Sequence, residues 1–239
     1  MAKIVQNPVV VMKRYELKYL LNEEQTAVLR QQLADHMEVD EFGLSTIASL
    51  YYDTPDFRLI RASIEKPPFK EKIRLRSYGR ATDTSPVFLE LKRKAYGIVY
   101  KRRVPTTIPL ANKFFAGEGD ICAPGQINRE ISYFRDYYQT LAPACLILCD
   151  RIAYYEPGGD LRLTIDYNPR YRATDLDLTS TMEGIPLLPL GHTILEIKAQ
   201  LSIPLWLSKI LNDAEIRKTS FSKYGAAYQQ QLSNLKEKR

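Results

Sequence analysis

The stretch KIRLRSYG, residues 72–79, alternates basic side chains with bulky apolar ones. Successive side chains of a β-strand point to opposite faces, so Arg74 and Arg76 would share one face while Ile73 and Leu75 share the other. Because the two arginines are two positions apart along the strand, their side chains leave the backbone roughly 6–7 Å from each other. Neither group loses its proton in a protein. The stretch therefore predicts a strand with one strongly positive face and one apolar face.

Five further segments alternate in the same way: RYELKY (14–19), FLELKRK (88–94), YKRR (100–103), LRLTID (161–166) and ILEIKA (194–199). A solvated outer face explains such alternation in a single strand, but solvated faces usually mix both signs of charge with neutral polar residues. Here the charged faces carry ten basic residues, Arg14, Lys18, Arg74, Arg76, Lys92, Lys94, Lys101, Arg103, Arg162 and Lys198, and four acidic ones, Glu16, Glu90, Asp166 and Glu196. Like charges facing one another destabilise a sheet, so this surplus predicts an anionic ligand.

A barrel with its charged face inward accounts for the alternation. We expect an α+β fold, a mainly antiparallel closed β-barrel with helices packed on its outside. Helices are predicted at 22–37, 127–142, 203–216 and 222–235. Asn22 is expected to cap the first helix together with Gln25, three residues further on. Since the sequence shows no repeat and no long linker, a single domain is expected over residues 1–239.

Composition narrows the choice of partner and compartment. Lysine and arginine number 34 against 28 acidic residues, a net charge of +6 that suits nucleic acid, an anionic membrane surface or a phosphorylated ligand. Three cysteines and two histidines make a disulfide framework or a histidine-based metal site unexpected. No apolar run approaches the roughly 20 residues that cross a bilayer, and no signal peptide is evident, so a cytosolic location is expected.

The planar guanidinium of arginine can donate two parallel hydrogen bonds to phosphate oxygens, and the ammonium group of lysine supplies a compact positive charge. Both groups along a tunnel suit a chain of phosphoryl groups. Chemistry on triphosphates usually needs a divalent cation held by hard oxygen ligands. Glu196 is the favoured ligand because its strand has few other inward charges. For Glu16, Glu90 and Asp166 a role as salt-bridge partners is equally plausible.

Eight motifs, in the order RYELKY, KIRLRSYG, FLELKRK, YKRR, DRIAY, LRLTID, ILEIKA and FSKYG, span nearly the whole chain. Together they resemble the catalytic domain of the vacuolar transporter chaperone (VTC) family, the polyphosphate polymerase branch of the triphosphate tunnel metalloenzymes, a CYTH-like superfamily. The resemblance implies an ATP:polyphosphate phosphotransferase that adds the γ-phosphate of ATP to a growing polyphosphate chain and releases ADP, with Mn²⁺ or Mg²⁺ as cofactor.

The resemblance also implies roles for individual residues. It matches Glu196 to the metal ligand and Ser222 to a phosphate-binding partner of Lys223. The residues that it implies in phosphate binding and catalysis are Lys18, Arg74, Arg76, Lys92, Lys101, Arg151, Arg162 and Lys223. Arg103 and Lys198 join the binding site by strand parity alone.

Two alternatives remain open. The first is a tri- or polyphosphate hydrolase of the same fold, although that branch opens with Glu-x-Glu-x-Lys, and Arg14 stands here in place of the first acid. The second is a non-catalytic module that binds polyphosphate or RNA. Nucleic acid is not the expected partner, because the aromatic residues are predicted on the faces opposite the charges. Eukaryotic relatives carry an inositol-phosphate-sensing domain and membrane helices, which this sequence lacks, so membrane attachment would require a separate partner.

Overall fold

A computed structural model describes residues 15–65, 67–96, 98–200 and 202–237. Arg14, assigned above to the charged face of the first strand, lies outside the described residues. The strands are β1 (Tyr15–Leu21), β2 (Glu38–Val39), β3 (Ser45–Asp53), β4 (Phe69–Tyr78), β5 (Val87–Ala95), β6 (Ile98–Thr106), β7 (Ala142–Tyr155), β8 (Arg162–Arg172), β9 (Ile185–Pro186), β10 (Thr193–Ala199) and β11 (Lys218–Thr219). The helices are α1 (Glu23–Leu33), α2 (Arg58–Glu65), α3 (Ile108–Phe115), α4 (Gln126–Tyr138), α5 (Leu205–Asp213) and α6 (Lys223–Glu237).

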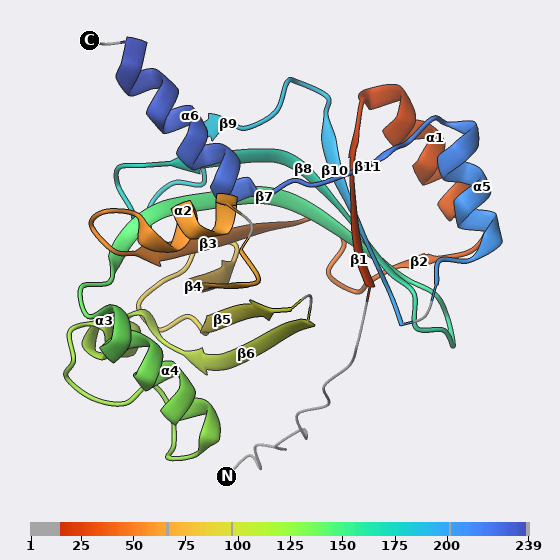
Figure 1. Ribbon diagram of the computed structural model, residues 1–239. Coiled ribbons are helices and arrows are strands. Elements are labelled where there is room, and N and C mark those ends of the chain that lie inside the picture. Colours follow the sequence, from red (N-terminus) through yellow and green to blue (C-terminus); the bar gives the residue numbers. More distant parts are fainter. Residues whose placement is uncertain (1–14, 66, 97, 201, 238–239) are drawn as a thin grey trace.

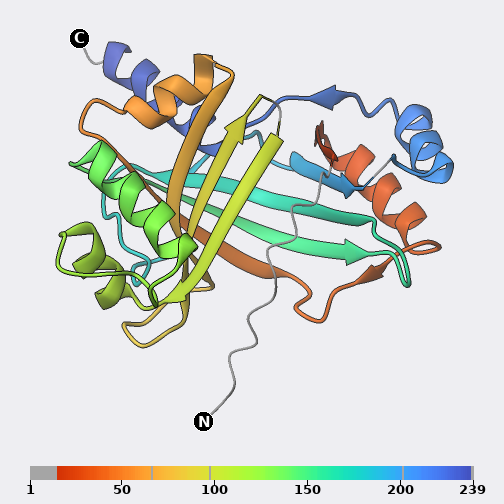
Figure 2. The same ribbon diagram turned by 60° about the horizontal axis from the view of Figure 1, so that its bottom comes forward.

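The strands form one 11-stranded antiparallel sheet in the order β11-β1-β10-β8-β7-β3-β4-β5-β6, with β2 paired to β7 and β9 paired to β8. The sheet curls strongly, so that β4, β5 and β6 cross in front of β7 and β8 (Figure 2). Along β4, side chains are buried at every second residue, as the alternation of KIRLRSYG predicts. The α+β class and the antiparallel pairing are therefore confirmed.

The prediction of a closed barrel is wrong. Among the described residues, β6 has no strand partner beyond β5, and β11 pairs with β1 over only two residues. The two ends of the sheet approach each other through side chains instead, with Lys92 Nζ of β5 lying 3.3 Å from Glu16 Oε2 of β1. The curl thus encloses a charged space without a continuous hydrogen-bonded wall.

Helices cover the outer face of the sheet at both ends (Figure 1). Helices α3 and α4 pack with β3–β7 in one apolar cluster, and α1 and α5 pack with β1, β8 and β10 in a second. The capping box predicted at Asn22 is present, since its side chain accepts a hydrogen bond from the Gln25 amide while the Gln25 side chain accepts one from the Asn22 amide. Four helices were predicted close to their observed positions, whereas α2 and α3, eight residues each, were missed.

A third apolar cluster interrupts the charged face. Ile60 of α2 and Tyr224 and Ala227 of α6 pack against Cys145 and Ile147 of β7. The two β7 residues have the same parity as Arg151, so α2 and α6 cover part of the face that was expected to be charged throughout. All three cysteines are free. Within the described part of the chain, no helix is long and apolar enough to span a membrane.

Candidate functional site: a cationic face enclosed by the sheet

The charged side chains of β4, β5 and β6 form rows across the three strands. We call each set of register-paired residues a rung. Three successive rungs on the same face are Lys72–Lys92–Lys101, Arg74–Glu90–Arg103 and Arg76–Phe88–Pro105. Rungs that are two residues apart along a strand lie roughly 6–7 Å from one another, so charges are presented at a regular interval.

Glu90 is the centre of this wall. Its carboxylate is 1% exposed and accepts two hydrogen bonds from Arg74, at 2.8 Å from Nε and 2.6 Å from Nη2. Lys101 Nζ lies 2.8 Å from the other carboxylate oxygen, and Arg76 Nη1 approaches to 3.7 Å. Burial raises the pKa of Glu90, but the surrounding cations outweigh it and hold the pKa far below its ordinary value. One buried acid, ionised at neutral pH, therefore gathers several cations.

Asp166 is the corresponding centre on β8. The carboxylate is 1% exposed and accepts two hydrogen bonds from Arg151 of β7, at 2.5 Å and 2.8 Å. Lys223, the first residue of α6, pairs with Asp166 Oδ2, the oxygen that also accepts from Arg151 Nη2. Burial raises the pKa of Asp166, whereas the two cations lower it further than burial raises it. This ion pair fixes the start of α6 against the charged face.

A third group joins β1 to β10. Lys18 Nζ lies 3.5 Å from both Glu16 Oε1 and Glu196 Oε2, so the two carboxylates converge on one ammonium group. Lys198 Nζ is 2.6 Å from Glu196, and Lys92 reaches Glu16 from across the enclosed space. The pKa of Glu196 is lowered because Lys198 and Lys18 overcome the effect of burial.

The first turn of α6 meets β3 and β4. Lys72 Nζ donates a hydrogen bond to Ser222 Oγ at 3.1 Å and lies 5.9 Å from the centroid of the Tyr224 ring. The Tyr224 hydroxyl donates to the buried carboxylate of Asp53 at 2.9 Å, and its ring stacks on Tyr51. Burial lowers the pKa of Lys72 to about 8. The pKa of Tyr51 is also about 8, because nearby cations, Arg74 first among them, outweigh burial.

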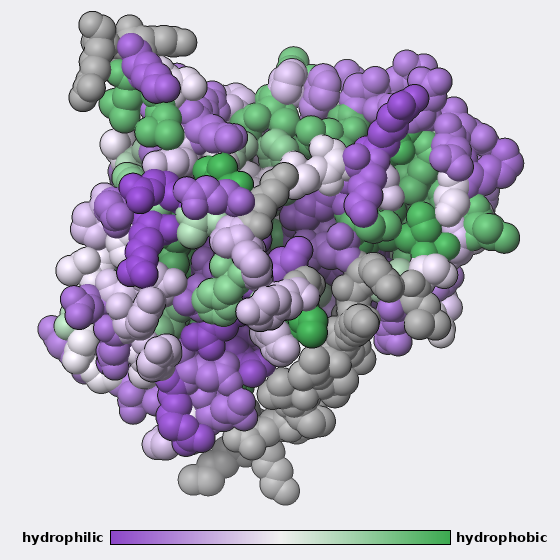
Figure 3. All heavy atoms as spheres, viewed as in Figure 1, coloured by the Kyte–Doolittle hydropathy of each residue, from purple (hydrophilic) through white to green (hydrophobic). Residues whose placement is uncertain are grey.

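These contacts link the charged side chains into one set, which we call the cationic face. Its ten cations are Lys18, Lys72, Arg74, Arg76, Lys92, Lys101, Arg103, Arg151, Lys198 and Lys223, and its four acids are Glu16, Glu90, Asp166 and Glu196. Hydrophilic residues gather in the recess near the middle of the surface shown in Figure 3. The cations outnumber the acids, so the face retains a large positive charge after every internal pairing.

The cationic face brings together all but one of the basic side chains predicted for the site. The exception is Arg162, which is exposed and lies 5.3 Å from the Tyr155 ring centroid rather than beside one of the four acids. Ser222 also adjoins the face through Lys72. The salt-bridge role suggested for Glu16, Glu90 and Asp166 is confirmed.

Two features of the face were not predicted from the sequence. Lys72 has the parity of Arg74 but was not selected, although the parity rule includes it. The prediction that aromatic residues avoid the charged face is wrong. The Tyr51 hydroxyl accepts a hydrogen bond from Arg74 Nη1 on this face, and Phe88 and Tyr78 have the inward parity of Glu90 and Arg76. The parity rule places Tyr78 with Arg76 and Phe88 with Glu90, so these two rings could have been assigned to the charged face from the sequence.

The acids fit a single divalent cation only in part. Glu16 and Glu196 converge from adjacent strands and offer the hard oxygen atoms that Mg²⁺ and Mn²⁺ prefer. The described residues contain no group of three or more acidic, histidine or cysteine side chains arranged to hold a metal. A cation held here would therefore need additional oxygen ligands from a bound phosphate.

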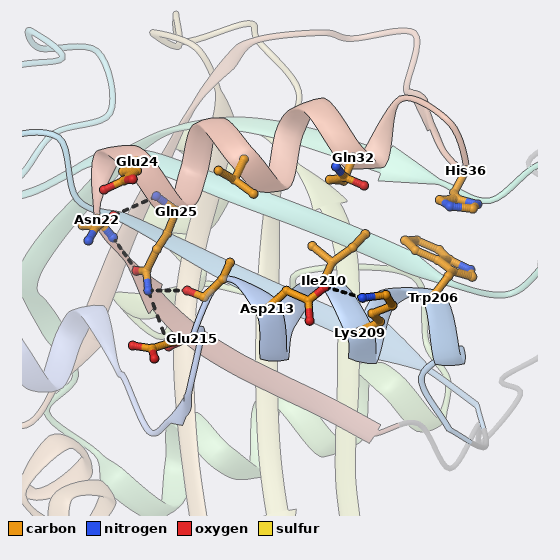
Figure 4. Close-up of a pocket in the computed structure, with 12 residues that line it drawn as sticks. Asn22, Glu24, Gln25, Gln32, His36, Trp206, Lys209, Ile210, Asp213 and Glu215 are labelled. Atoms are coloured by element: carbon orange, nitrogen blue, oxygen red, sulfur yellow. Dashed lines mark hydrogen bonds and ion pairs between the residues drawn. The ribbon is translucent and has the colours of Figure 1, made fainter.

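A separate groove of about 580 Å³ lies between α1 and α5 (Figure 4). The Gln25 side chain crosses it to donate to the Ala214 carbonyl at 3.0 Å, and His36 stacks on Trp206 with ring centroids 4.1 Å apart. The groove is lined by side chains of both charges and has no concentration of cations. We therefore place the candidate site on the cationic face.

A family model described as the VTC domain matches residues 13–232. The chain belongs to the VTC domain family. This match spans the strands of the cationic face and α6 up to residue 232, and it confirms the resemblance drawn from the short motifs. Among curated proteins, no match was found.

Solved structures show the fold of this VTC domain at low sequence identity. A candidate adenylate cyclase from Bacillus halodurans is 16% identical, with a TM-score of 0.54 over 88% of this chain and 96% of the other. A candidate adenylyl cyclase from Hippeastrum, described as having a dominant triphosphatase activity, is also 16% identical, with a TM-score of 0.50 over 87% and 92% of the two chains. At this identity the similarity establishes a shared fold.

Proposed function

We propose that this VTC domain is a metal-dependent polyphosphate polymerase that transfers the γ-phosphate of ATP to a growing polyphosphate chain and releases ADP. The observation that carries the proposal is the surplus of cations on the cationic face. Within the enclosed space, ten cations share four buried or half-buried acids. Partly desolvated cations require anionic acceptors, and a chain of phosphoryl groups supplies them at short regular intervals.

The side chains of the face suit the charge of a phosphoryl group in transfer. Arg74, Arg76 and Lys101 surround Glu90 and would exchange part of their contact with this acid for phosphate oxygens. Phosphoryl transfer needs alignment of donor and acceptor and neutralisation of the phosphoryl oxygens, and little covalent chemistry from the protein. The remaining phosphate-binding roles are assigned to Lys18, Lys92, Arg103, Arg151, Lys198, Ser222 and Lys223.

The reaction needs no side-chain nucleophile, since the terminal phosphate of the acceptor chain attacks. The two cysteines near the face are poor nucleophiles, because burial raises the pKa of Cys145 to about 12 and also raises that of Cys149. Glu196, with Glu16 beside it, would hold Mn²⁺ or Mg²⁺ together with oxygen atoms of the substrate. Such a cation supplies further neutralisation of phosphate charge.

A hydrolase acting on tri- or polyphosphate is the second candidate. It is favoured by one observation, the fold shared with the Hippeastrum protein that has triphosphatase activity. A binding module that holds polyphosphate without chemistry would also use a cationic face, but it would have no need for the convergence of Glu16 and Glu196.

Incubation of the purified protein with ATP and Mn²⁺ distinguishes the three candidate functions: polymerase, hydrolase and binding module. We expect ADP and a ladder of polyphosphate chains on a gel. Orthophosphate without chains would instead indicate the hydrolase, and metal-independent binding of polyphosphate without turnover would indicate the binding module.

Two variants complete the experiment. Glu196→Ala should abolish turnover while the protein remains folded, as judged by circular dichroism. Glu130→Ala removes a carboxylate from the outer face of the sheet, where it pairs with Arg102 at 2.9 Å, and should retain turnover. Equal activity of the wild type and Glu196→Ala would remove the proposed metal role.

A further inference from the structure

The cationic face changes its chemistry at one end of β4–β6. Beyond the Arg74–Glu90–Arg103 rung, the inward residue of β5 is Phe88, and the inward residue that follows Arg76 on β4 is Tyr78. The two rings meet edge to face with centroids 5.9 Å apart. Towards the opposite end of the same strands, the rung holds three lysines, Lys72, Lys92 and Lys101. The Phe88–Tyr78 pair therefore lies at the end of β4–β6 opposite the three lysines.

Arg103 joins the two chemistries. Its guanidinium carbon lies 3.8 Å from the Phe88 ring centroid and 5.5 Å from that of Tyr78, and Nη2 donates to the Tyr78 hydroxyl at 3.1 Å. Its Nε lies 3.8 Å from Glu90 Oε1. Tyr78 is 51% exposed and the Arg103 side chain 36% exposed, so one surface of this cluster faces solvent.

We propose that Tyr78 and Arg103, with Phe88 behind them, bind the base of a nucleoside triphosphate, an assignment that rests on the function proposed above. A planar base stacks on aromatic rings and on guanidinium planes, whereas inorganic phosphate chains gain nothing from either. Cation–π contacts also stabilise a fold in the absence of a ligand. The position of this cluster, directly beyond the arginine rungs on the cationic face, is what points to a ligand with an aromatic end and an anionic end.

The spacing agrees with such a ligand. One rung, roughly 6–7 Å, separates Phe88 from the Arg74–Glu90–Arg103 rung, a distance that a ribose and its 5′-phosphate can bridge. The triphosphate then runs along β4 from Arg76 towards Lys72, and its terminal phosphate points to the start of α6. The growing chain leaves on the lysine side, opposite the base.

The subsite is expected to bind a nucleobase with little specificity for which base it is. The hydroxyl of Tyr78 and one amino group of Arg103 are already paired with each other. Stacking accepts every base. We therefore expect ATP and GTP to bind with similar affinity.

The test compares ATP with inorganic tripolyphosphate by isothermal titration calorimetry in the same Mn²⁺ buffer. Tyr78→Leu should weaken ATP binding by roughly fivefold or more while tripolyphosphate binding changes less than about twofold. Tyr78→Phe keeps the ring and should retain most of the ATP affinity. Tyr155→Leu is the matched control, because Tyr155 of β7 lies beside Arg162 of β8 in a tyrosine–arginine contact of the same kind.

Three results would overturn the subsite. One is an unchanged ratio of ATP to tripolyphosphate affinity in Tyr78→Leu, whether both ligands weaken equally or neither weakens. Another is a selective loss of ATP binding in Tyr155→Leu, which would move the base to the opposite wall. The third is loss of ATP binding in Tyr78→Phe equal to that in Tyr78→Leu. Failure of the wild type to bind tripolyphosphate at all would instead overturn the proposed function itself, together with the subsite.

Discussion

The two faces of β4–β6 carry ion-pair networks that differ in charge balance. On the outer face, Arg93 and Arg102 pair with two acids, Glu71 and Glu130: Arg93 Nε lies 2.7 Å from Glu71, and Arg102 holds Glu130 with two bonds of 2.9 Å and 3.0 Å. Helix α4 covers this network, and Tyr138 donates a further hydrogen bond to Glu71. Each cation there has an acid, so the outer network is complete within the protein.

The inner face of the same strands is unbalanced. Around Glu90 stand four cations, Arg74, Arg76, Lys101 and Arg103, at 2.6 to 3.8 Å. Arginine–glutamate pairs occur on both faces, and both networks contain a nearly buried glutamate. Charge balance, and not the presence of arginine pairs, therefore distinguishes a face that stabilises the fold from a face that can bind an anion.

The largest expected difference between the faces concerns tripolyphosphate binding. Arg74→Ala should weaken binding by about 100-fold, because it removes charge-assisted hydrogen bonds to the ligand. Arg93→Ala should leave affinity within about twofold and lower the free energy of unfolding by about 3 kcal/mol, since it deprives the buried Glu71 of its cation. Calorimetric titration and urea denaturation measure the two effects.

The comparison between the two arginines would fail if both variants lost stability equally and neither lost affinity. In that outcome, the inner cations would be structural, as the outer ones are. Arg102→Ala provides a second outer-face control, because its bidentate contact with Glu130 has the same form as the contact of Arg74 with Glu90.

Acid sensitivity should also come mainly from the inner face. The pKa of Glu90 is far below its ordinary value in the folded protein, so the unfolded chain binds more protons in acid. Stability therefore rises with pH up to the ordinary pKa and is lost as the pH falls below about 4.5. One such buried carboxylate accounts for a loss on the order of 2–3 kcal/mol.

Glu90→Gln should reduce this acid-dependent loss, measured as the difference between urea unfolding free energies at neutral and acidic pH. Glu130→Gln is the outer-face control. Its carboxylate is 22% exposed, and although Arg102 lowers its pKa, solvent weakens the effect. An equal change in both variants would argue that the two networks contribute alike.

A smaller effect is expected in mild alkali. Burial lowers the pKa of Lys72 from 10.5 to about 8, so this cation loses its charge as the pH rises through 8. Tyr51, also with a pKa of about 8, gains a negative charge over the same range. Both changes weaken anion binding, and we expect tripolyphosphate affinity to fall by about threefold between pH 7 and pH 9.

Two variants separate the contributions of Lys72 and Tyr51 to this loss of affinity. Lys72→Arg keeps its charge and should show a shallower decline, and Tyr51→Phe should do the same for the tyrosine contribution. A pH profile as steep in the double variant as in the wild type would show that neither group controls binding. The sign for stability is opposite: because the folded pKa of Lys72 is depressed, its contribution to stability improves as the pH rises above about 8.

Strand parity predicted much of the inner face, because alternation in a strand directly assigns residues such as Lys18, Arg74 and Lys198 to one side. Parity could not show that the sheet stays open, since the approach of Lys92 to Glu16 depends on curl and not on local pattern. It also could not show that α6 turns its first residues into the enclosed space, where Lys223 meets Asp166.

The outer network was missed for a related reason. Arg93 and Arg102 have the parity of apolar neighbours such as Leu91 and Val104. They therefore lie on the face that the alternation predicts to be apolar, and a charged network was not expected there. Their partner Glu130 comes from α4, and pairing between a helix and a sheet is set by packing that no single strand encodes. The balance of charge on a face therefore emerges only from tertiary contacts.

The smallest expected effect sharpens the same contrast. Tyr138→Phe removes the hydroxyl that donates to Glu71 at 3.0 Å and keeps the ring that packs beside Phe134. A hydrogen bond of this kind contributes about 1 kcal/mol, so the urea midpoint should fall slightly while tripolyphosphate affinity stays unchanged. On the inner face, Tyr51→Phe likewise removes a hydroxyl, which lies 2.8 Å from Arg74, but this change should alter binding because that arginine belongs to the proposed phosphate-binding site. If both tyrosine variants changed only stability, the hydroxyl of Tyr51 would belong with the structural network, and the boundary between the two faces would have to be drawn closer to Glu90.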